Sequence, residues 1–233
     1  MMIGRFADRK ELLGFATVFI GGRTNSLRQD VDHCLGLLPP MAMHGEVRYA
    51  PFPAILYCFS TVDLFGALYS GDAVGHTTAN AKQYMLDLMQ YTDEQVRLLQ
   101  KLFRHKVVHL AQPKAALEDN GRIISWHYKH TGDPLHLTVC RLPPGCYVEI
   151  TPTWKVAADH QFRLDIDRFA SEIIASAITP PDCYLERLKA DPVLQQKFGA
   201  AISQIYDPRD HRGHRCEPAS RAIDLQGRGD FID

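Results

Sequence analysis

The chain lacks most of the short motifs that identify a reaction. Its 233 residues contain no GxxxxGK[ST] phosphate loop, no GxGxxG after an expected strand, no HExxH zinc motif and no GxSxG nucleophile elbow. These absences remove support from the common nucleotide-binding, zinc-protease and esterase classes.

Signs of secretion and of membrane insertion are missing as well. The six cysteines are scattered without CxxC spacing, and two of them, Cys34 and Cys58, lie in apolar helical surroundings typical of buried free thiols. We find no signal-peptide pattern and expect no apolar run long enough to span a bilayer. A cytoplasmic protein with no membrane partner is therefore expected.

The chain has no excess of charge of either sign. It carries 26 basic and 27 acidic residues, a formal net charge of -1, so no global field draws it onto nucleic acid. Any RNA contact must use a local patch, and Lys101, Arg104 and Lys106 form the one we identify. With 45% hydrophobic residues the chain can bury a sizeable core.

Residues 92–113 predict a strong amphipathic helix. Thr92 and Gln95 have capping-box spacing, and Pro113 marks the far boundary. An apolar stripe recurs at steps of three and four residues: Val96, Leu99, Leu102, Phe103 and Val107. The flank of this helix is basic, with Arg97, Lys101 and Arg104.

The end of this helix combines an arginine and two histidines. The string Arg104-His105-Lys106-Val107-Val108-His109 resembles the R-x4-6-H signature of HEPN domains, in which a polar residue follows the Arg; here it is His105. Residues 51–71 resemble the preceding helix of bacterial HEPN-like proteins, most of them uncharacterised. The resemblance covers roughly residues 51–113.

The resemblance implies a helical bundle that forms a homodimer with its motif helices facing each other. In active members it implies a metal-independent endoribonuclease. His109 would then be the acid or base, and Arg104 would hold the phosphate through paired hydrogen bonds. His105 would orient His109 or carry the second proton, with Lys101 as an auxiliary cation, and the dimer would duplicate these groups in one cleft.

A non-catalytic interpretation stays open beside this one. Histidine, arginine and lysine are ordinary residues at a helix C-terminus, because they complement the helix dipole. The protein would then be a dimeric interaction module that binds a protein partner such as an antitoxin, and Arg104 and His109 would cap the helix or stabilise the dimer. The two interpretations differ in whether these side chains face an open cleft or a satisfied hydrogen-bond network.

Asp63 is a further candidate, because it lies in residues 55–69, which read as a core helix. A buried carboxylate needs a partner. Arg104 or His109 could supply it across the bundle, and so could Ser60, Thr61 or a backbone amide nearby.

No cofactor or metal is expected. His105 and His109 fit a helical H-x3-H pair, but Asp63 is the one further ligand we can name. Two other groups contain ligand types and are interpreted as solvent-exposed side chains: His127, His130 and His136 around an expected hairpin, and His211, His214 and Cys216 near the C-terminal end.

The fold class expected is α+β and predominantly α: a HEPN-like helical bundle with a small antiparallel β addition. Residues 12–22 suit a strand or a helix that ends at Gly21 and Gly22. Further helices are expected at 25–38, 55–69, 79–91, 92–113, 167–178, 182–189 and 192–206. The segments 122–128 and 135–142 read as a hairpin, and 146–151 and 162–166 as added strands.

This pattern divides the chain into three parts. Residues 1–113 form the helical core, residues 114–206 hold the small sheet and returning helices packed on that core, and residues 207–233 form a flexible tail.

Overall fold

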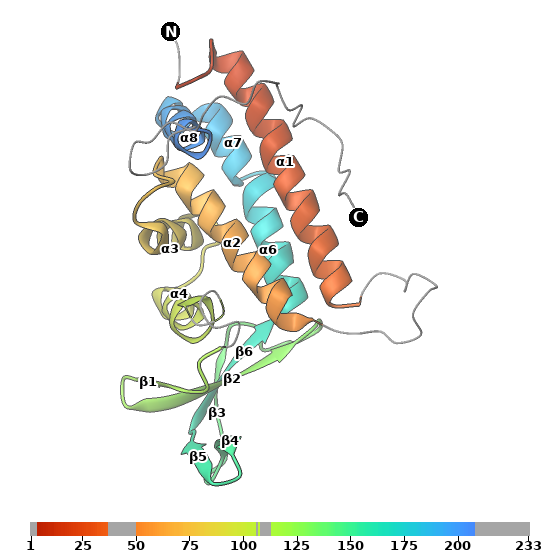
Figure 1. Ribbon diagram of the computed structural model, residues 1–233, viewed down its shortest axis with the longest axis vertical. Coiled ribbons are helices and arrows are strands. Elements are labelled where there is room, and N and C mark those ends of the chain that lie inside the picture. Colours follow the sequence, from red (N-terminus) through yellow and green to blue (C-terminus); the bar gives the residue numbers. More distant parts are fainter. Residues whose placement is uncertain (1–3, 37–49, 106, 108–112, 208–233) are drawn as a thin grey trace, which may run out of the picture.

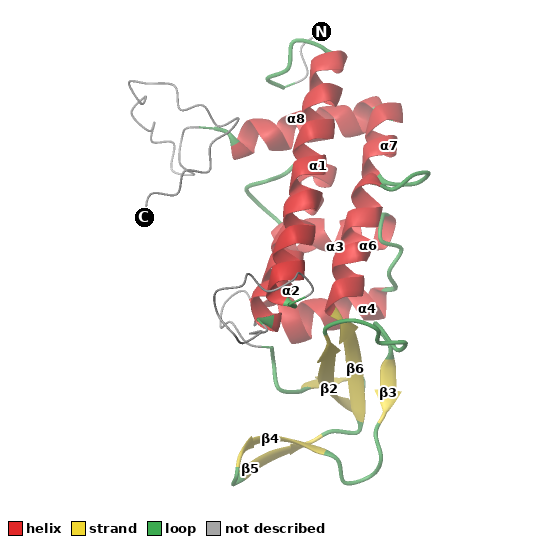
Figure 2. Ribbon diagram, turned by 90° about the vertical axis from the view of Figure 1, so that its right-hand side faces the viewer, coloured by secondary structure: helices red, strands yellow, loops and turns green. Residues whose placement is uncertain are grey.

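The helices form an elongated bundle, and the strands lie at one end of it (Figures 1 and 2). The computed structural model describes residues 4–36, 50–105, 107 and 113–207. Helix is the predominant structure within these residues, which confirms the mixed, mainly helical class. The helices are α1 (Arg9–Cys34), α2 (Pro51–Ser70), α3 (Thr77–Asp87), α4 (Asp93–Leu98), the π-helix η1 (Leu99–Arg104), α6 (Ile166–Ile178), α7 (Tyr184–Ala190) and α8 (Pro192–Ile205).

Helix α1 is continuous, and the predicted break at Gly21 and Gly22 is wrong. The Asp8 side chain caps its start by accepting from the Glu11 N–H. Its buried face runs without interruption along the helix: Leu12, Ala16, Ile20, Thr24, Leu27 and Val31. Packing of that stripe holds the two glycines in helical conformation, although glycine weakens an isolated helix.

Helix α2 is the core of the bundle, and it packs against α1, α3, α6 and α8. Pro51 opens it, and Gly71 ends it with a left-handed φ of 85°. By length and composition α2 could cross a membrane, so the expectation that no apolar run reaches that length is wrong. More than half of this apolar stretch is buried inside the protein, as is ordinary for the core helix of a bundle.

The main sheet is mixed, and the predicted hairpin of 122–128 with 135–142 is wrong. Its strands are β1 (Leu117–Asp119), β2 (Arg122–Lys129), β3 (Val139–Arg141) and β6 (His160–Asp165), in the order β1-β2-β6-β3. Strand β6 lies parallel to β2 and antiparallel to β3, so Phe162 is opposite both Trp126 and Val139.

The turn after β2 holds this arrangement in place. The Leu137 N–H donates to the Arg163 carbonyl, and the buried Asp133 carboxylate accepts from Arg163 Nε at 3.0 Å. These bonds carry the chain across β6 instead of back along β2. The residues of the turn do not show that β6, which comes later in the chain, lies between β2 and β3 in the sheet. The turn alone therefore predicts a hairpin that does not form.

A second, two-stranded sheet projects from the end of the molecule (Figure 2). It consists of β4 (Tyr147–Thr151) and β5 (Trp154–Ala157), which pair antiparallel as a hairpin. Strands are thus confirmed at the predicted segments 146–151 and 162–166. After β6, the helices α6, α7 and α8 return to pack on α1 and α2.

A glycine sets the distance between α2 and α3. A Cβ at Gly66 would lie 2.7 Å from backbone atoms of Asn80, whereas a Cβ at Gly22 on α1 would meet nothing within 4 Å. We expect Gly66→Ala to lower the free energy of unfolding by about 1–3 kcal/mol through overpacking. Gly22→Ala is the control and should raise it by about 0.5–1 kcal/mol. Urea denaturation measures both, and equal effects would refute close packing at Gly66.

Candidate functional site

The helix that leads to the R-x4-H string is capped at Thr92, as predicted. Thr92 Oγ1 accepts from the Gln95 N–H, and Gln95 Oε1 accepts from the Thr92 N–H at 2.8 Å, which makes a complete capping box. The predicted apolar stripe is buried at every position: Val96, Leu99, Leu102, Phe103 and Val107.

The second half of this helix departs from the prediction. Residues Leu99–Arg104 form a π-helix. A π-helix has more residues per turn than an α-helix, so the side chains that follow it point in other directions than α-helical spacing predicts. Arg104, expected on the basic flank, instead points inward and is 7% exposed. The spacing of apolar and basic residues could not predict the inward direction of Arg104, because such spacing assumes a regular α-helix.

Arg104 is held by two neighbouring helices. Its Nε donates to Asp63 Oδ1 at 2.9 Å and its Nη2 to Asp63 Oδ2 at 3.0 Å, which is the paired geometry of an arginine on a carboxylate. Its Nη1 donates to Thr78 Oγ1 at 2.8 Å. The guanidinium thus connects η1 with α2 and α3, and the Asp63 carboxylate occupies its Nε–Nη2 edge, one of the edges on which arginine binds a phosphate in paired fashion.

Of the partners that the sequence left open for Asp63, the described residues show Arg104 in contact with it, whereas His109 lies outside them. Ser60 and Thr61 donate their hydroxyls to backbone carbonyls of α2 instead. Burial raises the pKa of the Asp63 carboxyl, while Arg104 and the charge of His105 act to lower it. The electrostatic effect of His105 on Asp63 couples the buried pair to the surface next to it.

Basic side chains lie on the surface of the same helical segment. Arg97, Lys101 and His105 follow one another at intervals of four residues; Lys101 and His105 are exposed, and Arg97 is half-buried. Together with Lys82, Asp93 and Gln100 they line a surface pocket of about 220 Å³. We call Arg97, Lys101 and His105 the basic stripe.

The cations around this pocket differ in how firmly they are paired. Lys82 Nζ lies 2.9 Å from Asp93 Oδ1, and Arg97 forms an ion pair with Asp119. Lys101 has no acidic partner among the residues that the structure describes. Lys101 is therefore the cation most available to an anion in this pocket.

The predicted site residues separate into two groups. Asp63 and Arg104 form the buried pair, whereas Lys101 and His105 share the exposed pocket. His109 and Lys106 lie outside the described residues, as do His211, His214 and Cys216. In the described part of the chain, no group of three or more His, Cys, Asp or Glu residues has the arrangement of a metal site.

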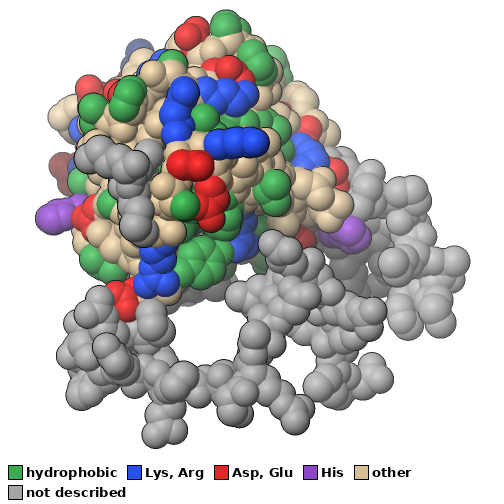
Figure 3. Space-filling view, turned by 90° about the horizontal axis from the view of Figure 1, so that it is seen from above, with side chains coloured by type: hydrophobic (Ala, Val, Ile, Leu, Met, Phe, Trp, Pro, Cys, Tyr) green, Lys and Arg blue, Asp and Glu red, His purple; other side chains and the backbone are tan. Residues whose placement is uncertain are grey.

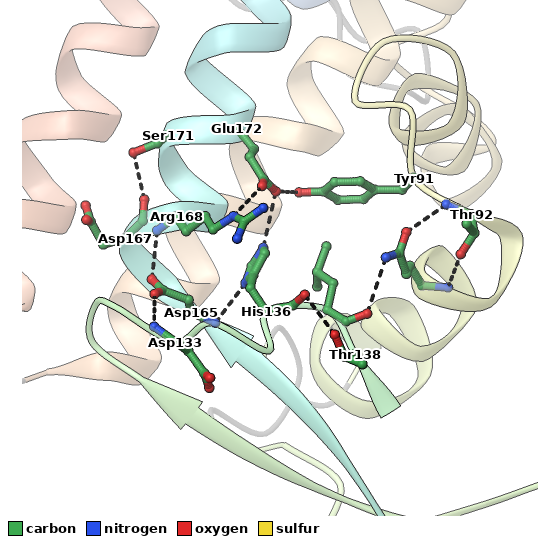
Figure 4. A network of polar contacts seen from close by, with 12 residues as sticks. Tyr91, Thr92, Asp133, His136, Thr138, Asp165, Asp167, Arg168, Ser171 and Glu172 are labelled. Atoms are coloured by element: carbon green, nitrogen blue, oxygen red, sulfur yellow. Dashed lines mark hydrogen bonds and ion pairs between the residues drawn. The ribbon is translucent and has the colours of Figure 1, made fainter. Parts of the chain in front are cut away.

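A second polar cluster, missed by the sequence analysis, joins the sheet to the bundle (Figure 4). The Glu172 carboxylate on α6 accepts from the Tyr91 hydroxyl, from Arg168 Nε at 2.9 Å and from His136 Nε2 at 3.2 Å. The other ring nitrogen of His136, Nδ1, accepts the Asp165 N–H at 2.9 Å. We call Tyr91, His136, Arg168 and Glu172 the junction cluster.

The expectation that His136 is a surface histidine is wrong, since the residue is 9% exposed. The Asp165 N–H donates to Nδ1 and the Glu172 carboxylate contacts Nε2, so both ring nitrogens are engaged within the protein. The cluster is therefore a structural junction. Its members come from three distant segments, and no local spacing in the sequence connects them.

Burial acts to raise the pKa of Glu172, but hydrogen bonds from His136, Tyr91 and Arg168 outweigh it and lower the pKa to about 2. The ordinary value for glutamate is 4.5. The carboxylate is thus strongly stabilised in its ionised form.

In comparisons with known proteins, no family model, no curated protein and no solved structure matches the chain. The HEPN-like assignment therefore rests on the motif residues and is taken up below as a proposal.

The buried ion pair gives a first prediction for this site. Arg104→Ala leaves Asp63 as a half-buried carboxylate without its partner, and we expect the free energy of unfolding to fall by about 3 kcal/mol. The double variant Asp63→Leu, Arg104→Met removes both charges and should cost less than Arg104→Ala alone. Denaturant titration of the single and double variants measures this. A loss under about 0.5 kcal/mol for Arg104→Ala, the range of surface substitutions, would contradict it.

The junction cluster gives a second prediction. Because the pKa of Glu172 is depressed in the folded protein, its contribution to stability is complete above about pH 4.5 and is lost as the pH falls toward 2. In the wild type this loss amounts to at most about 3 kcal/mol, and Glu172→Gln should abolish it. Thermal unfolding from pH 6 to pH 2 measures the difference. Glu118→Gln, on the exposed side of β1, is the matched control and should keep the wild-type profile.

Proposed function

We propose that this chain is a HEPN-like protein that binds RNA phosphates at the basic stripe and cleaves the RNA without a metal. The observation that carries the proposal is that Arg97, Lys101 and His105 line one surface pocket, in which Lys101 and His105 are exposed. A cation to bind the phosphate and a histidine to transfer protons are the groups that such a reaction needs.

The reaction class follows from these groups. A base takes the proton of the ribose 2′-hydroxyl, whose oxygen then forms a bond to the adjacent phosphorus, and the bond from phosphorus to the 5′-oxygen breaks. An acid gives that leaving oxygen a proton, so the products carry a 2′,3′-cyclic phosphate and a 5′-hydroxyl. No metal or external reactant is required.

The roles differ from those first expected of the motif. His105 is the proton-transfer group of the described residues, and Lys101, the cation of this pocket most available to an anion, contacts the phosphate. Arg104 is a positioning residue, because its guanidinium bonds to Asp63 and Thr78 and fixes the turn that presents His105. The second proton carrier is His109 or the His105 of the other copy in a homodimer, where a two-fold axis duplicates each group.

One observation favours a second function, the non-catalytic dimeric module that binds a protein partner such as an antitoxin. The motif arginine is buried and engaged within its own chain, as expected of a structural residue. In that case the basic stripe contacts acidic side chains of the partner, and no bond is broken.

The test is cleavage of a mixed pool of single-stranded and structured RNA in EDTA. The wild type should release fragments with 2′,3′-cyclic phosphate ends, and His105→Ala should lower the rate at least about 100-fold, the usual contribution of an acid–base group. Lys101→Ala should weaken RNA binding and reduce its salt dependence.

Matched controls separate loss of chemistry from loss of fold. His33→Ala and Lys129→Ala change the same residue types outside the pocket and should leave the rate unchanged. Circular dichroism and sedimentation check the fold and the oligomeric state of each variant. Folded wild-type protein without cleavage, or cleavage that His105→Ala leaves intact, would reject the nuclease; retained binding of an acidic partner would then favour the interaction module.

A further inference from the structure

An apolar groove lies between the start of α1 and the end of α8. Its volume is about 580 Å³, and apolar side chains line most of it: Phe6, Phe15, Val18, Phe19, Ile202 and Tyr206. Gly14 also borders the groove, and a Cβ placed there would meet nothing within 4 Å, so this part of the groove is open.

The walls of the groove are held by aromatic packing. The Phe15 ring lies 5.3 Å from Phe6 and 5.5 Å from Phe19 between centroids, and it packs against Phe198 behind them at 6.3 Å. Val18 nevertheless leaves 76% of its surface exposed, and Tyr206 leaves 43%. The groove is thus formed in advance and offers apolar surface that the described residues do not cover.

Its border is basic. Arg5 lines the groove, and the Arg23 guanidinium lies over the Phe19 ring at 5.2 Å from its centroid. In Figure 3, which views the molecule from the end where α1 begins, hydrophobic side chains lie among charged side chains of both signs, Lys and Arg included. An occupant that combines apolar side chains with carboxylates would match this surface.

The chain carries such a segment close by. The described residues end at Asp207, directly after Tyr206 of the groove, and 26 residues follow. Within them, residues 222–233 (AIDLQGRGDFID) combine five apolar residues with three aspartates and one arginine, a formal charge of -2. Phe231 and Ile232 lie directly between Asp230 and Asp233.

We propose that residues 222–233 dock into this groove, with Phe231 and Ile232 on its aromatic walls and the flanking aspartates facing Arg5 and Arg23. The intervening residues 208–221 can span about 50 Å when extended, so the segment easily reaches a groove that begins at Tyr206. Tethering gives it an effective concentration on the order of 1 mM. At this effective concentration, a segment that binds the groove with a Kd of about 0.3 mM occupies it roughly three quarters of the time.

The test is hydroxyl-radical footprinting of the full chain, which reads the solvent exposure of individual side chains. Phe231→Asp combined with Ile232→Asp should raise the modification rate of Phe15, Phe19 and Tyr206 by up to about fourfold, because the groove is then always open. Ala219→Asp combined with Ser220→Asp adds the same charge elsewhere in the tail and should match the wild type. Tyr147, on the distant hairpin, is the internal reference.

A change on the groove side should have the reciprocal effect. Val18→Asp removes an exposed apolar contact without touching the core, and it should raise the modification of Phe231. Sedimentation of each form distinguishes this contact from one between copies. Equal modification in all forms would overturn the proposal, and so would a fall in mass of the Phe231→Asp, Ile232→Asp variant, because the groove would then be covered by a second copy.

Discussion

The Asp63–Arg104 ion pair is the interaction on which the candidate site depends. Asp63 is the one charged side chain of α2, a helix that α1, α3, α6 and α8 surround. A carboxylate in that position is costly unless it is paired, and Arg104 supplies both hydrogen bonds from η1. Because Arg104 also bonds to Thr78, the pair fixes three helices at once and so positions the next residue, His105.

The two ends of the bundle are stabilised by different means. At the sheet end, the junction cluster satisfies a carboxylate, a histidine and a tyrosine from separate segments, so the sheet and the bundle are held by hydrogen bonds as well as by packing. At the opposite end, α1 and α8 meet through the rings of Phe15 and Phe198 and leave an apolar groove beside the last described residues. The sheet thus covers the first end of the bundle, whereas the second end exposes an apolar surface to which another segment can bind.

These features bear on how the motif is interpreted. An R-x4-H string was expected to place arginine on a phosphate, yet the arginine points into the protein and the exposed positions are taken by Lys101 and His105. The same residues thus divide into a buried pair that shapes the helix and a surface that is available to a ligand. Both proposed functions use this division, and they differ in whether His105 transfers a proton.

The sequence by itself determined the features that depend on near neighbours. The capping box of Thr92 and Gln95, the apolar stripe from Val96 to Val107 and the strong core helix were all predictable, because each depends on residues within a few turns of one another. Tertiary structure decided the rest. The π-helix turned Arg104 inward, continuous packing carried α1 through two glycines, and β6 entered between β2 and β3. Each of these depends on contacts between segments far apart in the chain, whose gain in burial and paired charge outweighs the local preference.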